Sequence, residues 1–133
     1  MEGVKKHVNA YLLFSVVTAL VGTALGVAIA GSNPYVAFPW LLTTLLALVT
    51  SVIGVFRLRG INEPYRYGVV AIQHIWWTTS VGFAGVMFYP ADYFVKVGGA
   101  GSIAMAVFSA IWLIWGLYLI YVVHKETKAP VAP

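Results

Sequence analysis

Long stretches without a charged side chain constrain this sequence most strongly. No Asp, Glu, Lys or Arg occurs between positions 7 and 56, 67 and 91, or 97 and 124. A helix needs about 20 mainly apolar residues to cross the hydrocarbon core of a membrane. The first stretch therefore has room for two such helices, and each of the others for one. Only 9% of the 133 residues are charged and 61% are hydrophobic, against about 25% charged in soluble domains. The sequence predicts an all-α integral membrane protein.

We expect one membrane domain over residues 1–133, with four transmembrane helices arranged as two antiparallel hairpins. The predicted spans cover about residues 8–30, 36–56, 69–89 and 102–123. Residues 31–35 are rich in turn formers, and so short a link makes the first two spans antiparallel neighbours. Residues 57–68 are predicted to form a basic loop and residues 124–133 a polar tail, both cytoplasmic.

The positions of the basic residues predict how this bundle is oriented. With four spans, all but one of the eight Lys and Arg residues fall on the side that holds both termini and the 57–68 loop. The positive-inside bias assigns that side to the cytoplasm, so both termini are expected inside the cell. Because the charges mark the ends of spans, the net charge of +4 does not indicate a nucleic-acid partner. The residues on this side are Lys5, Lys6, Arg57, Arg59, Arg66, Lys125 and Lys128.

Small residues recur at helical spacing and predict which faces pack together. Thr18, Gly22, Gly26 and Ala30 fall every fourth residue, so they form one stripe along the first span. In hydrocarbon, such stripes let helix backbones approach closely, and close packing drives the association of helices. The later spans carry similar sets of expected packing residues: Thr43, Ala47, Thr50 and Gly54 in the second, Thr78 and Gly82 in the third, and Ser102, Ala106 and Ala110 in the fourth.

His74 is the strongest candidate for chemistry within a predicted span. It lies about five residues inside the third span, roughly 8 Å below the boundary, where a polar group needs a partner. No second axial haem ligand is expected at the same depth, and Cys is absent, as are carboxylates within the spans. We therefore expect His74 to bond to a neighbouring helix. A haem or quinone contact at His74 stays open only with a partner chain, and no metal or catalytic site is expected.

Four indole rings and three arginines are the candidate surfaces for a partner or for lipid. Tryptophan offers broad, rigid contact area with a polar edge, and cytoplasmic arginines attract anionic head groups. The residues of these candidate surfaces are Trp76, Trp77, Trp112, Trp115, Arg57, Arg59 and Arg66.

These features favour a small non-catalytic subunit within a larger membrane protein assembly, for which an energy-transducing respiratory complex is one example. The main alternative is a homo-oligomeric channel or facilitator for a small solute or ion. Its pore would be lined by the hydroxyls of Thr43, Thr50, Thr78, Thr79 and Ser80. A redox subunit that contacts haem or quinone, and a membrane-embedded viral or scaffold protein, are further alternatives. A proton-coupled carrier is disfavoured, because no Asp or Glu falls within a predicted span.

Overall fold

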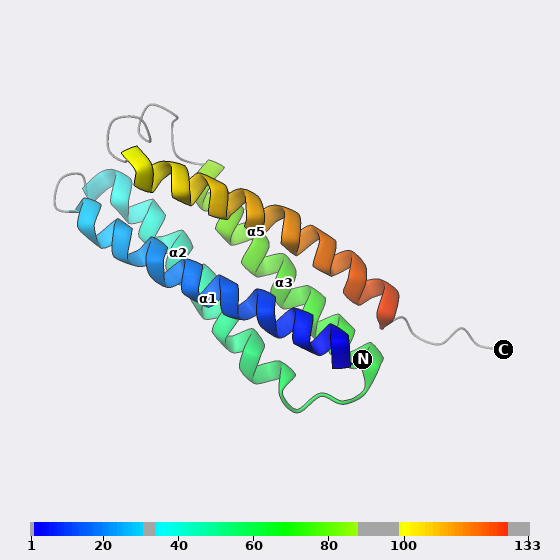
Figure 1. Ribbon diagram of the computed structural model, residues 1–133. Coiled ribbons are helices and arrows are strands. Elements are labelled where there is room, and N and C mark those ends of the chain that lie inside the picture. Colours follow the sequence, from blue (N-terminus) through cyan, green and yellow to red (C-terminus); the bar gives the residue numbers. More distant parts are fainter. Residues whose placement is uncertain (1, 31–33, 88–98, 128–133) are drawn as a thin grey trace.

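The described part of the chain is a bundle of four antiparallel helices. The computed structural model describes residues 2–30, 34–87 and 99–127, which form α1 (Glu2–Ala30), α2 (Pro34–Leu58), α3 (Pro64–Met87) and α5 (Gly99–Glu126). The helices lie side by side, and each runs antiparallel to the one before it (Figure 1). α1 and α3 each pack against both α2 and α5, and they also meet each other across the centre. Over the described ranges, the prediction of an all-α fold with four helices is confirmed.

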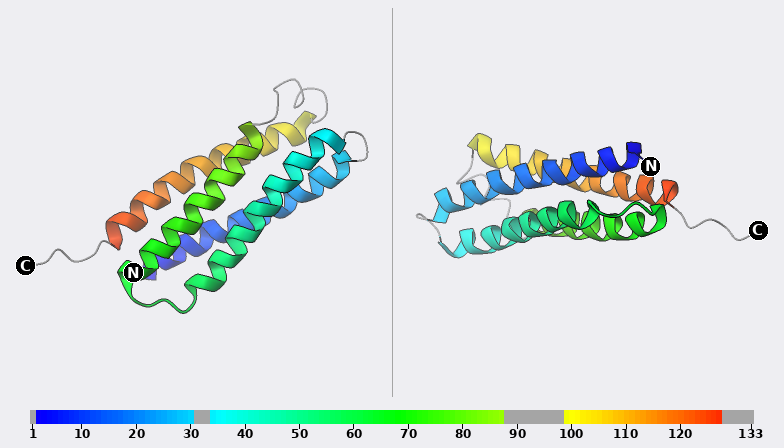
Figure 2. Two further views of the ribbon diagram at one scale, coloured as in Figure 1. Left: turned by 180° about the vertical axis from the view of Figure 1, so that it is seen from behind. Right: turned by 90° about the horizontal axis from the view of Figure 1, so that it is seen from below.

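The basic residues gather at one end of this bundle. The start of α1, the turn between α2 and α3 and the end of α5 lie together there (Figures 1 and 2). We call this the basic end. Lys96 and Lys128 lie outside the described residues. The described Lys and Arg residues at the basic end are Lys5, Lys6, Arg57, Arg59, Arg66 and Lys125.

Helical structure extends into the segment 57–68 that we expected to be a loop. α2 continues to Leu58, and α3 already begins at Pro64. The carboxylate of Glu63 accepts hydrogen bonds from the backbone N–H groups of Tyr65 at 3.0 Å and Arg66 at 2.6 Å. These bonds satisfy two donors that the first turn leaves free, and Pro64 suits the first helical position because its missing N–H has no partner there. Glu63 therefore fixes where α3 starts.

The end of α5 is anchored to the start of α3. The predicted tail is helical as far as Glu126, and the buried Thr127 follows it. The Thr127 side chain lies where a side chain at Gly68 would be, so the absence of a Cβ at Gly68 permits this contact. Residues 128–133 of the predicted tail lie outside the described residues.

Large apolar side chains cover the outward faces of α1, α2 and α5, while several polar side chains are buried. Leu13 on α1, Leu42 on α2 and Ile114 on α5 are all half exposed or more. The buried polar residues are Ser15, Thr18, Thr44, Ser51, His74, Thr78, Thr79 and Thr127. Water-soluble helices normally show the opposite pattern, with the apolar stripe facing inward.

Two stretches among the described residues are long and apolar enough to cross a membrane. They are Glu2–Ala24, which belongs to α1, and Leu41–Leu58, which belongs to α2. α3 is less apolar, because residues 73–80 include an amide, an imidazole and three hydroxyls. These polar side chains distinguish α3 from the more apolar α1 and α2.

We expect Glu63→Ala to destabilise the bundle by about 1 kcal/mol, because the start of α3 loses its cap. Thermal unfolding followed by circular dichroism in mild detergent measures the effect. Glu126→Ala is the matched control, since a carboxylate at a helix C-terminus is slightly unfavourable and its removal costs nothing. Equal melting temperatures for the two variants would contradict the capping role of Glu63.

Candidate functional site

His74 lies on α3, and its side chain faces α2, where both ring nitrogens have hydrogen-bond partners. Only 3% of its surface is exposed. Nδ1 lies 3.0 Å from the backbone carbonyl oxygen of Thr50, and Nε2 lies 3.1 Å from a guanidinium nitrogen of Arg57. A guanidinium can only donate, so Nε2 accepts from Arg57 and Nδ1 donates to Thr50. The imidazole is thus held as the neutral tautomer with its hydrogen on Nδ1.

A glycine on α2 makes room for this histidine. A Cβ at Gly54 would lie 3.1 Å from Cβ and Cγ of His74, which is closer than such atoms normally approach. One turn further along α3, the hydroxyls of Thr78 and Thr50 form a hydrogen bond of 3.0 Å. Thr50 and Gly54 of the second predicted span therefore face His74 and Thr78 of the third, and these small residues allow polar groups to bond across the contact.

A second group of hydrogen bonds joins α1, α3 and α5. The hydroxyls of Tyr11 on α1 and Thr79 on α3 are hydrogen-bonded to each other. The indole N–H of Trp112 on α5 donates to the hydroxyl of Ser15 at 2.8 Å, and Ser15 in turn donates to the backbone carbonyl of Tyr11 at 2.9 Å. Hydrogen bonds to Tyr11 and Ser15 of α1 thus link the three helices in the buried centre.

Gly82 and Gly116 make room for the side chains of this second group of hydrogen bonds. A Cβ at Gly82 would lie 2.6 Å from the Trp112 ring, and one at Gly116 would overlap the hydroxyls of Thr79 and Tyr11. Nearer the basic end, the indole N–H of Trp115 donates to Nε2 of His7 at 2.8 Å. We use the term polar core for the following residues, which make the hydrogen bonds between helices described above: His7, Tyr11, Ser15, Thr50, His74, Thr78, Thr79, Trp112 and Trp115.

The other expected packing residues differ in where they lie. Thr18, Gly22 and Ala47 are buried and Thr43 is half-buried, whereas Ala110 is exposed. The side chains of Gly26, Ala30, Ser102 and Ala106 lie outside the described part of the chain.

Trp112 is not on the outer surface, where we expected it. It is only 2% exposed, because Gly82 leaves space for its ring and Ser15 accepts its N–H. Trp115 is half-buried against α1. Trp76 and Trp77, in contrast, are 55% and 52% exposed, and Arg57, Arg59 and Arg66 are exposed at the basic end. Two of the four predicted indoles therefore remain as open surface.

The exposed indoles belong to a distinct face of α3. Gln73, Trp76, Trp77 and Ser80 are all exposed, and their spacing of three and four residues puts them on one side of the helix. We call these four residues the α3 outer face. An amide and a hydroxyl flank two rigid aromatic rings here, whereas the outward faces of α1 and α2 carry mainly aliphatic side chains. This face is the strongest candidate for an interaction surface.

Sequence reasoning missed Tyr11, Ser15 and Gly116 as contact residues. Ser15 and Tyr11 lie one and two helical turns before Thr18, so continuing that helix face backwards by steps of three and four residues would have found both. Within the described ranges, no three His, Cys, Asp or Glu side chains lie close enough together to hold a metal ion. Comparison of the chain with protein-family models, curated proteins and solved structures finds no match in any of the three.

We expect Gly54 and His74 to be energetically coupled. Gly54→Ala should destabilise the bundle by about 1 to 3 kcal/mol, because the added methyl group presses on His74. In a His74→Ala background the same substitution should cost less, because the contacts with Cγ and Nδ1 are gone and only the contact with Cβ remains. A double-mutant cycle of thermal unfolding measures the coupling, which reaches about 0.5 to 3 kcal/mol for residues in contact. Additive effects would contradict the packing of His74 on Gly54. Gly3→Ala, with nothing within 4 Å of the added Cβ, is the control.

Proposed function

We propose that this chain is an integral membrane subunit that packs through the α3 outer face against a different membrane protein. The observation that carries the proposal is the exposure of Gln73 beside Trp76 and Trp77, on a helix that buries its imidazole and its two threonine hydroxyls. An amide facing hydrocarbon without a partner is costly. A partner helix that offers a hydrogen-bonding group at this position removes that cost.

Four observations support a membrane location. Large aliphatic and aromatic side chains are exposed on all four helices, and α1 and α2 contain stretches that are long and apolar enough to cross a bilayer. The described Lys and Arg residues gather at the basic end, as expected for the cytoplasmic side of a membrane protein. Buried polar groups that bond to one another also suit a bundle with no water around its middle.

The polar core favours a packing subunit over a channel. The hydroxyls of Thr50 and Thr78 bond to each other, and the hydroxyl of Thr79 is engaged by Tyr11. These are three of the five residues that a pore would use, and they point into the chain's own helix contacts. Their bonding inside one chain weighs against a pore lined by the same hydroxyls in several copies.

The two exposed indoles fit a partner contact in chemistry and in position. Tryptophan is enriched among residues that dominate the binding energy of interfaces, because a rigid ring buries much area at little entropic cost. Trp77 is additionally held edge-on to the His74 ring, with centroids 6.3 Å apart. The polar core therefore supports the α3 outer face from behind, so this surface is preorganised for a partner.

The proposed topology predicts the labelling pattern of single cysteines, which can be introduced freely because the chain has none of its own. A cysteine introduced by Glu63→Cys should react with an impermeant maleimide only after the cells are permeabilised. One introduced by Ser32→Cys, in the link predicted on the opposite side, should react in intact cells. The reverse pattern would contradict the orientation, and labelling of both sites in intact cells would contradict the membrane location.

Docking through the α3 outer face predicts a specific loss of the partner. In mild detergent, the native mass of the wild-type assembly should exceed 14.4 kDa by the mass of a different chain. Trp76→Ala combined with Trp77→Ala should weaken the assembly by about 2 kcal/mol or more, roughly 30-fold in affinity. The matched control, Ile114→Ala with Leu117→Ala, removes two exposed side chains of α5 and should keep the partner. Whole multiples of 14.4 kDa would overturn the proposal in favour of a homo-oligomer.

A further inference from the structure

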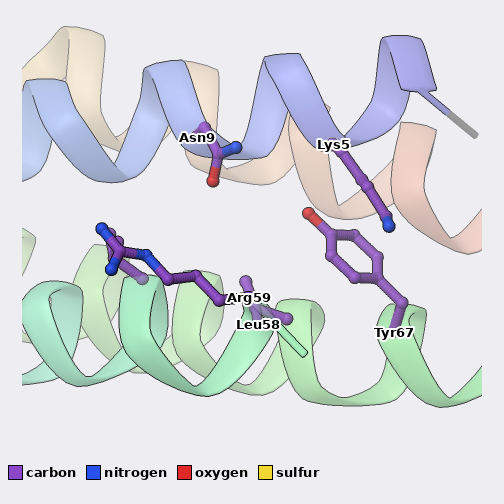
Figure 3. A pocket seen from close by; sticks show the side chains of 6 residues that line it. Lys5, Asn9, Leu58, Arg59 and Tyr67 are labelled. Atoms are coloured by element: carbon purple, nitrogen blue, oxygen red, sulfur yellow. The ribbon is translucent and has the colours of Figure 1, made fainter. Parts of the chain in front are cut away.

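A pocket opens at the basic end, between α1 and the adjoining ends of α2 and α3. It has a volume of about 200 Å³ and is lined by Lys5, Asn9, Val55, Leu58, Arg59 and Tyr67. Figure 3 shows Asn9 and Lys5 reaching down from α1, with Arg59 and Tyr67 opposite them. A water molecule takes about 30 Å³ of liquid volume, so the pocket is large enough for several waters or for one tetrahedral oxyanion with its substituent.

The charge of the pocket is entirely positive. Lys5 and Arg59 are its ionisable cations, and none of its lining residues is acidic. The partners that the structure gives these cations are neutral, because Lys5 donates to the Asn62 amide oxygen at 3.4 Å and the Arg59 guanidinium lies over the Phe56 ring. Both cations thus keep their charge available to an anion.

Tyr67 indicates what kind of group the pocket accepts. Its side chain is only 2% exposed, and its hydroxyl points into the space between α1 and α2 (Figure 3). Among the described residues the hydroxyl has no hydrogen-bond partner, while Lys5 lies over the ring at 5.6 Å from its centre. Burial raises the pKa of Tyr67 to about 12, so the hydroxyl is protonated at neutral pH and can donate. A buried donor without a partner is costly, and a ligand that accepts a hydrogen bond removes that cost.

We propose that this pocket binds a phosphoryl group, held by Lys5, Arg59, the Asn9 amide and the Tyr67 hydroxyl. Arginine and hydroxyl donors together match the several acceptor oxygens of a phosphate. Val55 and Leu58 give the pocket an apolar wall, which suits the glycerol end of a phospholipid. If the membrane orientation in the proposed function holds, the pocket lies at the cytoplasmic head-group level, where basic pockets between helices bind anionic lipids.

Lipid and free phosphate are distinguished by two arms of one experiment on the purified full chain. In neutral detergent, native mass spectrometry follows the binding of short-chain phosphatidic acid, with phosphatidylcholine of equal chain length for comparison. Isothermal titration calorimetry measures the binding of inorganic phosphate. Saturable binding of phosphatidic acid alone identifies a lipid head-group site. Saturable binding of inorganic phosphate identifies a site for free phosphate. Either result supports the proposal, provided that the pocket variants below weaken the Kd.

Matched variants test whether binding occurs in this pocket. Arg59→Gln and Tyr67→Phe should each weaken the Kd about tenfold, the effect of losing one hydrogen bond to a charged group. Arg66→Gln removes the same charge from an exposed residue of the basic end that does not line the pocket, so it should leave the Kd unchanged. Thermal unfolding confirms that each variant is folded.

Three results would overturn the proposal: no saturable binding in either arm, an equal loss of affinity for Arg59→Gln and Arg66→Gln, or no effect of Tyr67→Phe. The variants at Trp76 and Trp77 lie outside the pocket and should leave phosphoryl binding intact. If the Trp76 and Trp77 variants lose the partner but the wild-type chain binds no phosphoryl group, only the pocket proposal is contradicted. If the wild-type chain binds a phosphoryl group but these variants keep the partner, only the docking proposal is contradicted.

Discussion

The structure depends on burying polar side chains where a glycine of one helix faces a larger side chain of another. A buried imidazole, indole or phenol needs a hydrogen-bond partner, and the partner must lie on another helix at bonding distance. Glycine opposite the large ring supplies that distance. Gly54 admits His74, Gly82 admits Trp112, and Gly116 admits the bonded pair Tyr11 and Thr79. Each ring then does two things, since it fills the space above the glycine and ties its helix to a neighbour. The bundle is thus specified by particular pairs of residues as well as by general hydrophobicity.

This arrangement divides the molecule into a closed interior and two open surfaces. The polar core uses its donors and acceptors within the chain, so it offers little to a solute or an ion. The α3 outer face and the basic pocket keep polar groups directed outward or into unfilled space. They differ in chemistry, because the first combines a neutral amide with aromatic rings and the second combines cations with a phenol. Both include residues of α3, but Tyr67 lines the pocket whereas Gln73, Trp76, Trp77 and Ser80 form the outer face, so the two surfaces use different residues.

The sequence predicted most of the fold because its strongest signals are local. Charge-free tracts and turn residues gave the number and the direction of the helices, and the regular spacing of Thr78 and Gly82 placed His74 on a packed face. Trp112 was misplaced because its burial depends on Gly82 and Ser15, which belong to two other helices. The early start of α3 was missed although Glu63 and Pro64 are a recognisable capping pair. The pocket could not be predicted, because it brings together Lys5, Arg59 and Tyr67 from three elements far apart in the sequence.

The close contact between each glycine and its large neighbour also limits how such a sequence can evolve. A lineage that replaces Gly54 with a larger residue must shorten the side chain at position 74, and the same dependence joins Gly82 to Trp112 and Gly68 to Thr127. Apolar residues elsewhere in the bundle exchange with one another at little cost, so overall similarity fades quickly. These paired positions are separated by 20 to 59 residues in the chain. Covariation between them should therefore still be detectable after overall sequence similarity is lost. Divergent relatives of this bundle are best recognised by such pairs.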